Sequence, residues 1–301
     1  MQILARIVER VPRPFFEAAV RVRNLSPFLA GRTQWLADRL HKSDVMIRTG
    51  LAAGLRFTAG RSNVAYLANG TLEPDTEQAL AEVLRPKMTF YDVGGHFGLH
   101  SLIAARIVGP LGSVLSFEPL RENQSLFEHN VRLNNFGNIR CIPVAVGDRD
   151  CESTFLLSSC LSCGALADQP WSPEGCVGEV AVEVRRLDTL IAEGKIPSPQ
   201  VVKMDIEGGE TAALAGAENL LATARPILII ELHETAEAVS HVLTRHRYAA
   251  CPIGSRAPIE RMIGNVHIIA IPSEHADCGK LLERFGDPSF PICYRCRKIA
   301  C

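Results

Sequence analysis

Five acidic residues that each stand at or just after an apolar stretch are the part of this sequence best suited to chemistry. They are Asp92, Glu118, Asp148, Asp205 and Glu231. Carboxylates attract cations, accept hydrogen bonds from hydroxyl groups and remove protons. If the apolar stretches are strands of one doubly wound sheet, their carboxyl ends meet at one edge and the acids line one crevice. A single acid there can also cap a helix, and capping is the favoured interpretation for Asp148 and for Glu210.

A glycine-rich turn follows the first of these stretches, Thr89 to Val93, whose β-branched and aromatic residues predict a short buried strand. The glycines of the turn are Gly94, Gly95 and Gly98. They let a ligand contact bare backbone where a helix begins at Leu99. The dinucleotide fingerprint is not met, because Val93 occupies the position of its first glycine. The carboxylate of Asp92 favours a cationic ligand instead, such as the amino group and sulfonium of S-adenosylmethionine, although such a turn can also bind nothing.

Glu118 ends the next predicted strand, Ser113 to Phe117, and lies 20 residues after Gly98. An acidic residue at this distance contacts the ribose hydroxyls in nucleotide-binding βαβ units. A carboxylate can accept hydrogen bonds from both vicinal hydroxyls, so the residue type fits this chemistry. Pro119 keeps the chain extended, and a helix is predicted from about Asn123.

The composition is that of an ordinary folded protein, with 47% apolar and 22% charged residues among 301. The net charge of -1 gives no sign of a surface for polyanions, so nucleic acid is not expected as the main partner. No uncharged apolar run approaches the roughly 18 residues of a membrane span. Arg6, Glu9 and Arg10 interrupt any secretory signal, so a cytoplasmic protein is expected.

No metal is predicted. The ten cysteines are expected to be reduced thiols, because no secretory signal precedes them. Two pairs, Cys160/Cys163 and Cys293/Cys296, have the spacing of zinc ligands, but neither lies in a compact ribbon-like segment, and scattered thiols are the favoured interpretation. Asp148, Asp205 and Glu231 could hold Mg²⁺, but nothing in the sequence requires it.

Four segments are predicted along the chain: a helical basic N-terminal extension (1–44), a hairpin and a helix (45–86), a core domain (87–272) and a C-terminal tail (273–301). The basic extension is either an amphipathic contact with a membrane surface or a lipid substrate, or a helix docked on the main domain, and docking is favoured. Within the core, residues 150–186 form an insert with paired strands at 154–157 and 180–184. The loop between them, 158–178, is long enough to be a lid or a substrate-selecting element.

Predicted strands and helices alternate along the core, which predicts an α/β fold with a doubly wound, mostly parallel seven-stranded sheet. The seven predicted strands are 89–93, 113–117, 139–146, 200–205, 226–232, 247–253 and 265–271. Helices are predicted from 74 to about 84, from 99, from 123 to 133, from about 210 to 224 and from 235 to 245. Ligands of such a sheet lie outside the carboxyl ends of its strands.

Taken together, these motifs resemble the FkbM-type methyltransferases over roughly residues 54–235. The resemblance rests on 92–98 (Asp-Val-Gly-Gly-His-Phe-Gly), 117–119 (Phe-Glu-Pro), 145–148 (Ala-Val-Gly-Asp), 187–190 (Leu-Asp-Thr-Leu) and above all 202–210 (Val-Lys-Met-Asp-Ile-Glu-Gly-Gly-Glu). It implies a Rossmann-like class I fold, S-adenosylmethionine as cofactor, and methylation of hydroxyl oxygens on sugars, glycolipids or natural-product precursors. The resemblance therefore implies that the partner is a small-molecule or lipid-linked acceptor that carries a hydroxyl group.

The resemblance also implies roles for individual residues. Asp92, Gly94 and Gly98 would hold the methionine part of the cofactor, Glu118 the ribose, and Pro119 and Ala145 would border the adenine. Asp205 would face the methyl group or the acceptor. The family usually has Ala-Asn where this chain has Gly95 and His96, so the bulk and the pKa of His96 would alter the cofactor contacts or place a base near the site.

The base that removes the acceptor proton has four candidates: Asp205, Glu231, His233 and His96. Lys203 would tune the charge of Asp205, because both side chains lie on the same side of their strand. The alternatives are structural: Lys203 and Glu231 pair at the end of the sheet, and Glu207 caps the next helix. A non-catalytic module that binds the cofactor or a nucleotide, acting as a membrane-surface scaffold, is the alternative function. An NAD-dependent oxidoreductase is disfavoured because of Val93.

Overall fold

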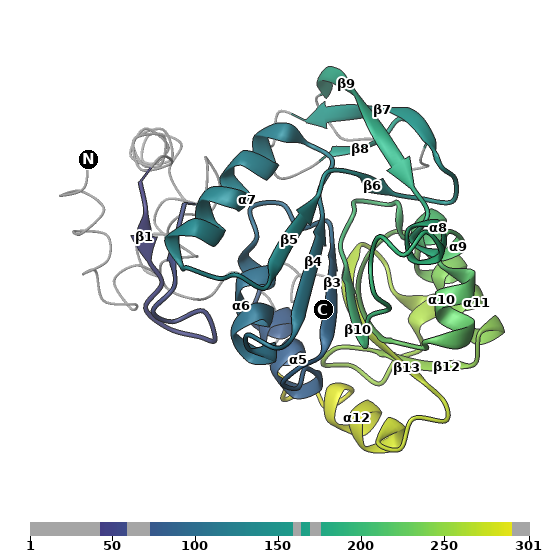
Figure 1. Cartoon of the computed structure of the whole chain (residues 1–301). Coiled ribbons are helices and arrows are strands. Elements are labelled where there is room, and N and C mark those ends of the chain that lie inside the picture. Colours follow the sequence, from purple (N-terminus) through teal and green to yellow (C-terminus); the bar gives the residue numbers. More distant parts are fainter. Residues whose placement is uncertain (1–42, 59–72, 159–163, 169–175, 291–301) are drawn as a thin grey trace, which may run out of the picture.

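The core of the molecule is one mixed sheet of seven strands with helices on both faces (Figure 1). The computed structural model describes residues 43–58, 73–158, 164–168 and 176–290. The strands of the sheet are β3 (Thr89–Val93), β4 (Ser113–Phe117), β5 (Ile139–Ile142), β10 (Val201–Met204), β11 (Ile227–His233), β12 (Tyr248–Pro252) and β13 (Asn265–Pro272). All seven stretches predicted as strands therefore contribute to it.

The strand order is β12-β13-β11-β10-β3-β4-β5. Neighbours from β11 to β5 pair in parallel, whereas β13 runs antiparallel to β11 and to β12. From β3 the chain first adds strands on one side, β4 and β5, and later on the other, β10 and β11. The boundary between β3 and β10 is therefore the point where the winding reverses, which is where doubly wound sheets bind ligands.

Helices cover both faces because neighbouring residues of each strand point to opposite sides and nearly all are apolar. One face is covered by α5 (Pro74–Val83), α6 (Leu99–Val108), α7 (Arg121–Leu133) and α12 (Cys278–Phe285). The other is covered by α8 (Leu187–Ala192), α9 (Glu210–Ala215), α10 (Glu218–Thr223) and α11 (Ala236–Arg245). A short 3₁₀ helix, Ile259–Arg261, precedes β13.

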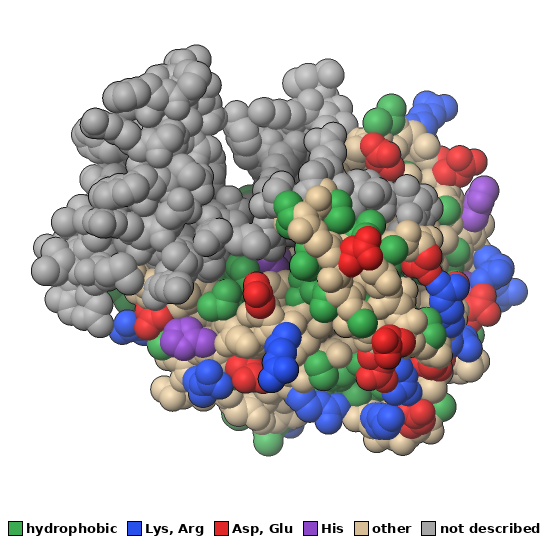
Figure 2. Space-filling view, turned by 90° about the horizontal axis from the view of Figure 1, so that it is seen from above, with side chains coloured by type: hydrophobic (Ala, Val, Ile, Leu, Met, Phe, Trp, Pro, Cys, Tyr) green, Lys and Arg blue, Asp and Glu red, His purple; other side chains and the backbone are tan. Residues whose placement is uncertain are grey.

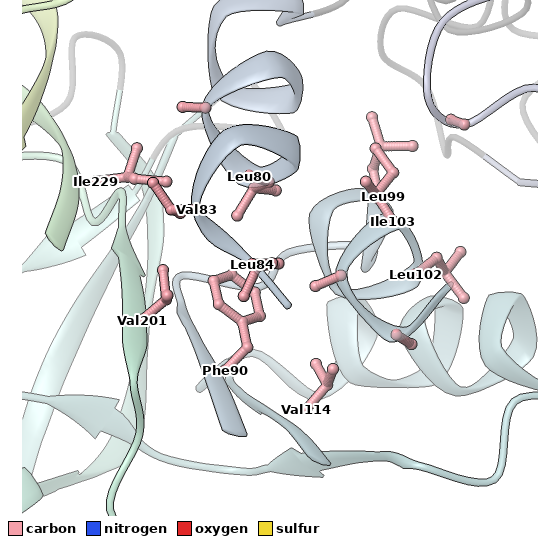
Figure 3. Packing of buried hydrophobic residues seen from close by; sticks show 14 of the residues in the cluster. Leu80, Val83, Leu84, Phe90, Leu99, Leu102, Ile103, Val114, Val201 and Ile229 are labelled. Atoms are coloured by element: carbon pink, nitrogen blue, oxygen red, sulfur yellow. The ribbon is translucent and has the colours of Figure 1, made fainter. Parts of the chain in front are cut away.

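The packing of α5 and α6 against the first face is drawn in Figure 3. Side chains from α5 (Leu80, Val83, Leu84) and from α6 (Leu99, Leu102, Ile103) meet Phe90, Val114, Val201 and Ile229 of four neighbouring strands. Helix α5 is thus part of the hydrophobic core, although it precedes the first strand of the sheet. Its N-terminus lies at the carboxyl end of β11 and the amino end of β13, since Asp75 contacts His267.

Two predicted elements are divided in the structure. The stretch 139–146 forms β5 and then β6 (Ala145–Val146), which belongs to another sheet. Pro143 separates them, because proline has no N–H to donate to a strand ladder. The helix predicted from about 210 to 224 ends at Gly216, whose missing Cβ would lie 1.9 Å from the carbonyl oxygen of Gly147. Close contact between these two backbones therefore replaces one continuous helix by α9 and α10.

Three strands of the insert join β6 in a second sheet of four strands, in the order β6-β9-β7-β8. The paired strands predicted there are confirmed as β7 (Cys151–Ser158) and β9 (Cys176–Arg185), which run antiparallel with Thr154 opposite Ala181. Part of the predicted loop is strand β8 (Gly164–Leu166), paired with β7. The predicted hairpin before the core is confirmed by β1 (Val45–Met46) and β2 (Arg56–Phe57), which also pair antiparallel.

Some predictions fall outside the described residues: the helical extension up to residue 42 and the pairs Cys160/Cys163 and Cys293/Cys296. None of the helices in the described segments combines the length and the hydrophobicity that a membrane span requires. Figure 2 shows the molecule from above the view of Figure 1. Acidic and basic side chains alternate over the described part of this face, in keeping with a net charge near zero.

Candidate active site

The site lies where β3 and β10 meet. Asp92 and Lys203 are direct partners in the register of these strands, and Ser116 is the partner of Asp92 on β4. Toward the amino ends the same strand face carries Phe90, Val114 and Val201, which pack in the core. At the carboxyl end this face therefore changes from apolar to charged. This is the switch point of the sheet, where doubly wound α/β proteins bind their ligands.

Lys203 connects the two acids of this edge. Its Nζ lies 3.5 Å from Oδ1 of Asp92 and 3.2 Å from Oδ2 of Asp205. Burial acts to lower the pKa of Lys203, but Asp205 and Asp92 outweigh it and raise this pKa, so the ammonium stays charged. Burial alone would raise the pKa of Asp205, yet Lys203 and His233 lower it. Asp205 is therefore a carboxylate, and its other oxygen is directed toward His233.

Asp92 is the more deeply buried of these two acids. Its Oδ2 accepts a hydrogen bond of 2.6 Å from Oγ of Ser101, in the first turn of α6. Burial raises the pKa of Asp92, and the charge of Lys203 and the hydrogen bond from Ser101 only partly oppose this. A cationic ligand beside Asp92 would lower that pKa again, because an opposite charge favours the ionised form.

The turn after β3 is shaped by close backbone contacts. Gly94 has a φ of +81°, and a Cβ there would lie 1.9 Å from the carbonyl oxygen of Asp205. A Cβ on Gly95 would lie 1.7 Å from Oγ of Ser116. The backbone N–H groups of both glycines donate to the carbonyl oxygen of Phe117. These two glycines are therefore required for the turn to fit between β4 and the loop after β10, independently of any ligand.

Glu118 lies one strand over from Asp92, as its position in the sequence predicts. Its carboxylate accepts hydrogen bonds from the backbone N–H groups of His96 and Leu120 (2.9 Å each) and from Nδ2 of Asn123 (3.1 Å). Burial raises the pKa of Glu118 to about 7, against the effect of these three donors. Three of the roughly four acceptor positions of a carboxylate are thus occupied, which leaves room for one further hydroxyl donor.

Three further predicted cofactor residues, His96, Pro119 and Ala145, have the following contacts. His96 has a φ of +47°, and its ring stacks on Phe97 with the centroids 3.6 Å apart. The carbonyl oxygen of Pro119 accepts a hydrogen bond from Nε2 of Gln124. Ala145 is buried in β6, where it pairs with Val184 of the insert. The adenine border that the resemblance implies would therefore be made partly by the four-stranded sheet.

Next to Lys203 and Asp205, at the same edge of the sheet, His233 lies among four carboxylates. Nδ1 of His233 lies 3.0 Å from Oε1 of Glu210, and Nε2 faces carboxylate oxygens of Asp205, Glu207 and Glu231 at 3.4 to 3.9 Å. Burial acts to lower the pKa of His233, but the hydrogen bond to Glu210 and the neighbouring charges raise it to about 9. All four predicted catalytic residues, Lys203, Asp205, Glu231 and His233, thus form one contiguous group.

Glu231 is also held from the opposite side. Its Oε2 lies 3.3 Å from Nε2 of His267 on β13, and Nδ1 of His267 lies 2.9 Å from Oδ2 of Asp75 at the start of α5. Asn265 donates from Nδ2 to Oε1 of Glu231 at 3.4 Å. The structural alternative that pairs Glu231 with Lys203 is not what the structure records, since Lys203 pairs with the two aspartates.

Several residues of the site were not identified from the sequence. They are Asp75, Ser101, Ser116 and His267. No short motif marks them. Ser101 and Ser116 lie inside a helix and a strand, and Asp75 and His267 come from elements that are far apart in the sequence. Glu210 was interpreted as a helix cap; its Oε1 does accept the N–H of Gly208 before α9, but it also orients His233. Asp148 is exposed at the surface, where its carboxylate faces Arg149.

Residues 92–249, just over half of the chain, match the model of the methyltransferase FkbM domain family, and the chain belongs to that family. A curated relative, the hexuronic acid methyltransferase AglP of Haloferax volcanii, is 26% identical over 166 residues, which cover 54% of this chain and 62% of the relative. The chain thus spans about three-fifths of the length of this relative.

Two methyltransferases are among the solved structures that this chain matches. The methyltransferase FkbM of Methylobacillus flagellatus is 17% identical, with 69% of this chain and 54% of that chain covered and a TM-score of 0.43. A SAM-dependent O-methyltransferase of Thermotoga maritima is 13% identical, with coverage of 65% and 64% and a TM-score of 0.38.

Proposed function

We propose that this protein transfers a methyl group from S-adenosylmethionine to a hydroxyl oxygen of a sugar, a glycolipid or a natural-product precursor. The observation that carries the proposal is the pair of buried acids on neighbouring strands, Asp92 and Glu118, on either side of a turn whose glycines leave no space for side chains. Membership of the FkbM family supports methyl transfer as the reaction. The curated relative that acts on a hexuronic acid supports a sugar acceptor.

The cofactor would lie across the carboxyl ends of β3 and β4. Its amino group and sulfonium carry positive charge, which the carboxylates of Asp92 and Asp205 favour. Glu118 would accept a hydrogen bond from one ribose hydroxyl, because its remaining acceptor positions already have protein donors. Gly94, Gly95, His96 and Gly98 would contact the methionine part, and Pro119 and Ala145 the adenine.

The reaction is an in-line displacement at carbon. The acceptor oxygen forms a bond to the methyl carbon while the carbon–sulfur bond breaks, and its electron pair stays on sulfur, which gives neutral S-adenosylhomocysteine. The acceptor proton passes to a base. The protein therefore has two tasks, to align oxygen, carbon and sulfur and to accept a proton.

Asp205 is the proposed acceptor-facing residue, because it stands between Lys203, beside the cofactor turn, and His233. The ammonium of Lys203 keeps Asp205 ionised and therefore able to accept a hydrogen bond from the acceptor hydroxyl. Glu231 lies next to it as a further proton acceptor, whereas His233, whose pKa is raised to about 9, is already protonated at neutral pH. The location of the protein in the cytoplasm and its contact with a membrane surface remain predictions.

Cofactor binding is tested first by thermal denaturation with S-adenosylhomocysteine, NAD, NADP and ATP, each at the same concentrations. Only S-adenosylhomocysteine should raise the melting temperature, by an amount that grows with its concentration above Kd. Calorimetry with the same ligand then gives the affinity. Selective stabilisation by NAD, or no heat with S-adenosylhomocysteine at millimolar concentration, would refute the proposal.

Transfer is tested with radiolabelled methyl donor and a panel of sugar, polyketide and lipid-linked alcohols. Asp205→Asn should lower turnover by at least about a hundredfold, the usual effect of removing a proton acceptor, while S-adenosylhomocysteine binding stays within a few fold. Asp148→Asn, at the surface, is the matched control and should leave turnover unchanged. Cofactor binding with no transfer to any alcohol would favour the non-catalytic scaffold.

A further inference from the structure

Asp205, Glu231 and His233 lie at the ends of β10 and β11 and share one geometric property. In each side chain one polar atom contacts a neighbouring residue outside the group, and a second polar atom, called the inner atom below, faces the other two side chains. Nδ1 of His233 is bound by Glu210, which leaves Nε2 on the inner side. Oδ2 of Asp205 is bound by Lys203, which leaves Oδ1.

Glu231 completes the set. Its Oε2 lies against His267, which leaves Oε1 on the inner side, where it accepts a long hydrogen bond from Asn265. One ligand atom from each of Asp205, Glu231 and His233 lies within 4.8 Å of the other two.

The spacing of the inner atoms does not fit direct hydrogen bonds. Nε2 of His233 is 3.9 Å from Oδ1 of Asp205 and 3.9 Å from Oε1 of Glu231. An N–H···O bond is about 2.7–3.2 Å long. Two atoms that each bind one cation at about 2.0–2.2 Å lie about 3 to 4 Å apart, depending on the angle between them. The observed separations therefore fit ligands of a shared ion better than they fit partners of each other.

The buried histidine is the second observation that points to a cation. Only 2% of the His233 side chain is exposed, and its Nδ1 faces the carboxylate of fully buried Glu210. The carboxylate on Nδ1 keeps a proton on that nitrogen, so a bound cation would displace the proton of Nε2; a carboxylate is the usual outer contact of histidines that bind metals. His267, itself bound by Asp75, orients Glu231 in the same manner.

We propose that Asp205, Glu231 and His233 bind a divalent cation at the acceptor side of the site. The two carboxylates suit a hard ion such as Mg²⁺ or Mn²⁺, and the imidazole favours Mn²⁺ of these two; water or the acceptor would fill the remaining positions. Oε2 of Glu207, 3.4 Å from Nε2 of His233, can supply a fourth protein ligand.

The role of the ion rests on the proposed function, although its binding does not. A hydroxyl oxygen that coordinates a divalent cation loses its proton more easily, so the ion would activate the acceptor and fix its position beside the methyl group. A carboxylate of an acidic sugar could bind the same ion. The ion would thereby allow an anionic acceptor to enter a site whose own side chains are mainly acidic.

The experiment uses the full-length protein, treated with EDTA and dialysed, and MnCl₂ as the probe. Titration followed by electron paramagnetic resonance measures the loss of the free Mn²⁺ signal, and pulsed measurements detect coupling to a coordinated imidazole nitrogen. We expect one tight site per chain, nitrogen coupling, and competition by MgCl₂. Glu231→Gln and His233→Asn should each weaken binding at least tenfold, whereas Glu152→Gln, an exposed residue of β7, should not.

No tight Mn²⁺ site in the unsubstituted protein, or a site without nitrogen coupling, would overturn the proposal whether or not the variants fold. Binding that is unchanged in folded Glu231→Gln would do the same and would leave a metal-free cluster of His233 and carboxylates. Titration with S-adenosylhomocysteine in EDTA separates this result from the proposed function. If that ligand binds and Mn²⁺ does not, only the metal site fails; if Mn²⁺ binds and the cofactor does not, only the methyltransferase proposal fails.

Discussion

Nζ of Lys203 lies 3.5 Å from Oδ1 of Asp92 on the neighbouring strand, and at most 5% of either side chain is exposed. The pair joins the two strands at the point where the winding of the sheet reverses. Because a charge that loses its partner in such a place cannot be solvated, the strength of this contact can be measured by removing one member.

Lys203→Met should lower the free energy of unfolding by about 3–5 kcal/mol, because it leaves buried Asp92 and partly buried Asp205 without their counter-charge. Urea denaturation at pH 7 measures the change. The double variant Lys203→Met/Asp92→Asn should lose less stability than the sum of the single variants. Lys195→Met, which removes an exposed lysine, is the control and should stay within about 0.5 kcal/mol. Equal stability of the Lys203 and Lys195 variants would show that the pair is not structural.

Gly95→Ala should destabilise the turn by about 1–3 kcal/mol, as overpacking of a filled site does. The new Cβ would lie 1.7 Å from Oγ of Ser116 and 3.1 Å from its Cβ. Ser116→Gly removes both atoms, so the double variant should resemble Ser116→Gly alone in chemical denaturation. Gly137→Ala is the matched control, since nothing lies within 4 Å of its missing Cβ. Additive losses in the double variant would contradict this contact.

Glu118 should make stability depend on pH between about 4.5 and 7. Burial raises its pKa from 4.5 to about 7, so the folded state keeps a proton that the unfolded state has already lost. The contribution of Glu118 to the free energy of unfolding is therefore greatest below pH 4.5. It falls as the pH rises from 4.5 to 7 and stays constant above pH 7. The difference of 2.5 in pKa corresponds to a loss of about 3 kcal/mol as an upper value.

The measurement is urea denaturation of the unsubstituted protein and of Glu118→Gln at several values of pH. Other buried acids contribute to the same slope, among them Glu77 with a pKa raised to about 7 by burial. Only the difference between the two proteins therefore reports Glu118. Parallel curves for the two proteins would mean that Glu118 is not protonated in the folded state at pH 5.

Leu80→Ala should cost about 2–5 kcal/mol, the usual range for a fully buried leucine. Leu80 lies on α5, before the residues that match the family model, yet it packs among side chains of α6 and of the sheet (Figure 3). Leu111→Ala, whose side chain is 76% exposed, should change stability by less than about 0.5 kcal/mol. Thermal or urea denaturation of the two variants compares them directly. A small effect at Leu80 would show that α5 is only loosely attached to the core.

The strands and most helices could be predicted from the sequence because their apolar residues alternate or continue over whole elements. The split of 139–146 follows from Pro143 and could have been recognised. The break at Gly216 could not, because it depends on contact with Gly147, which is far away in the sequence. Local patterns therefore predicted which residues form elements, and long-range contacts determined where two of the elements are interrupted.

The candidate site was predicted only where its residues follow strands in the sequence. Asp92, Glu231 and His233 lie near the carboxyl ends of strands, and Glu118 and Asp205 come directly after strands, so their position could be inferred before their contacts were known. Their catalytic and binding roles remain predictions. The contacts that orient Glu231 could not be predicted from the sequence. They involve His267 of β13 and its partner Asp75 of α5, which are 192 positions apart.

Asp75 and His267 lie on opposite sides of the residues 92–249 that match the family model, yet together they orient Glu231. A chimaera that carries only residues 92–249 on another scaffold would contain Glu231 but would lack Asp75 and His267, which orient it. Gene-fusion boundaries for this protein should therefore be drawn outside α5 and β13, however well the intervening segment aligns with its relatives.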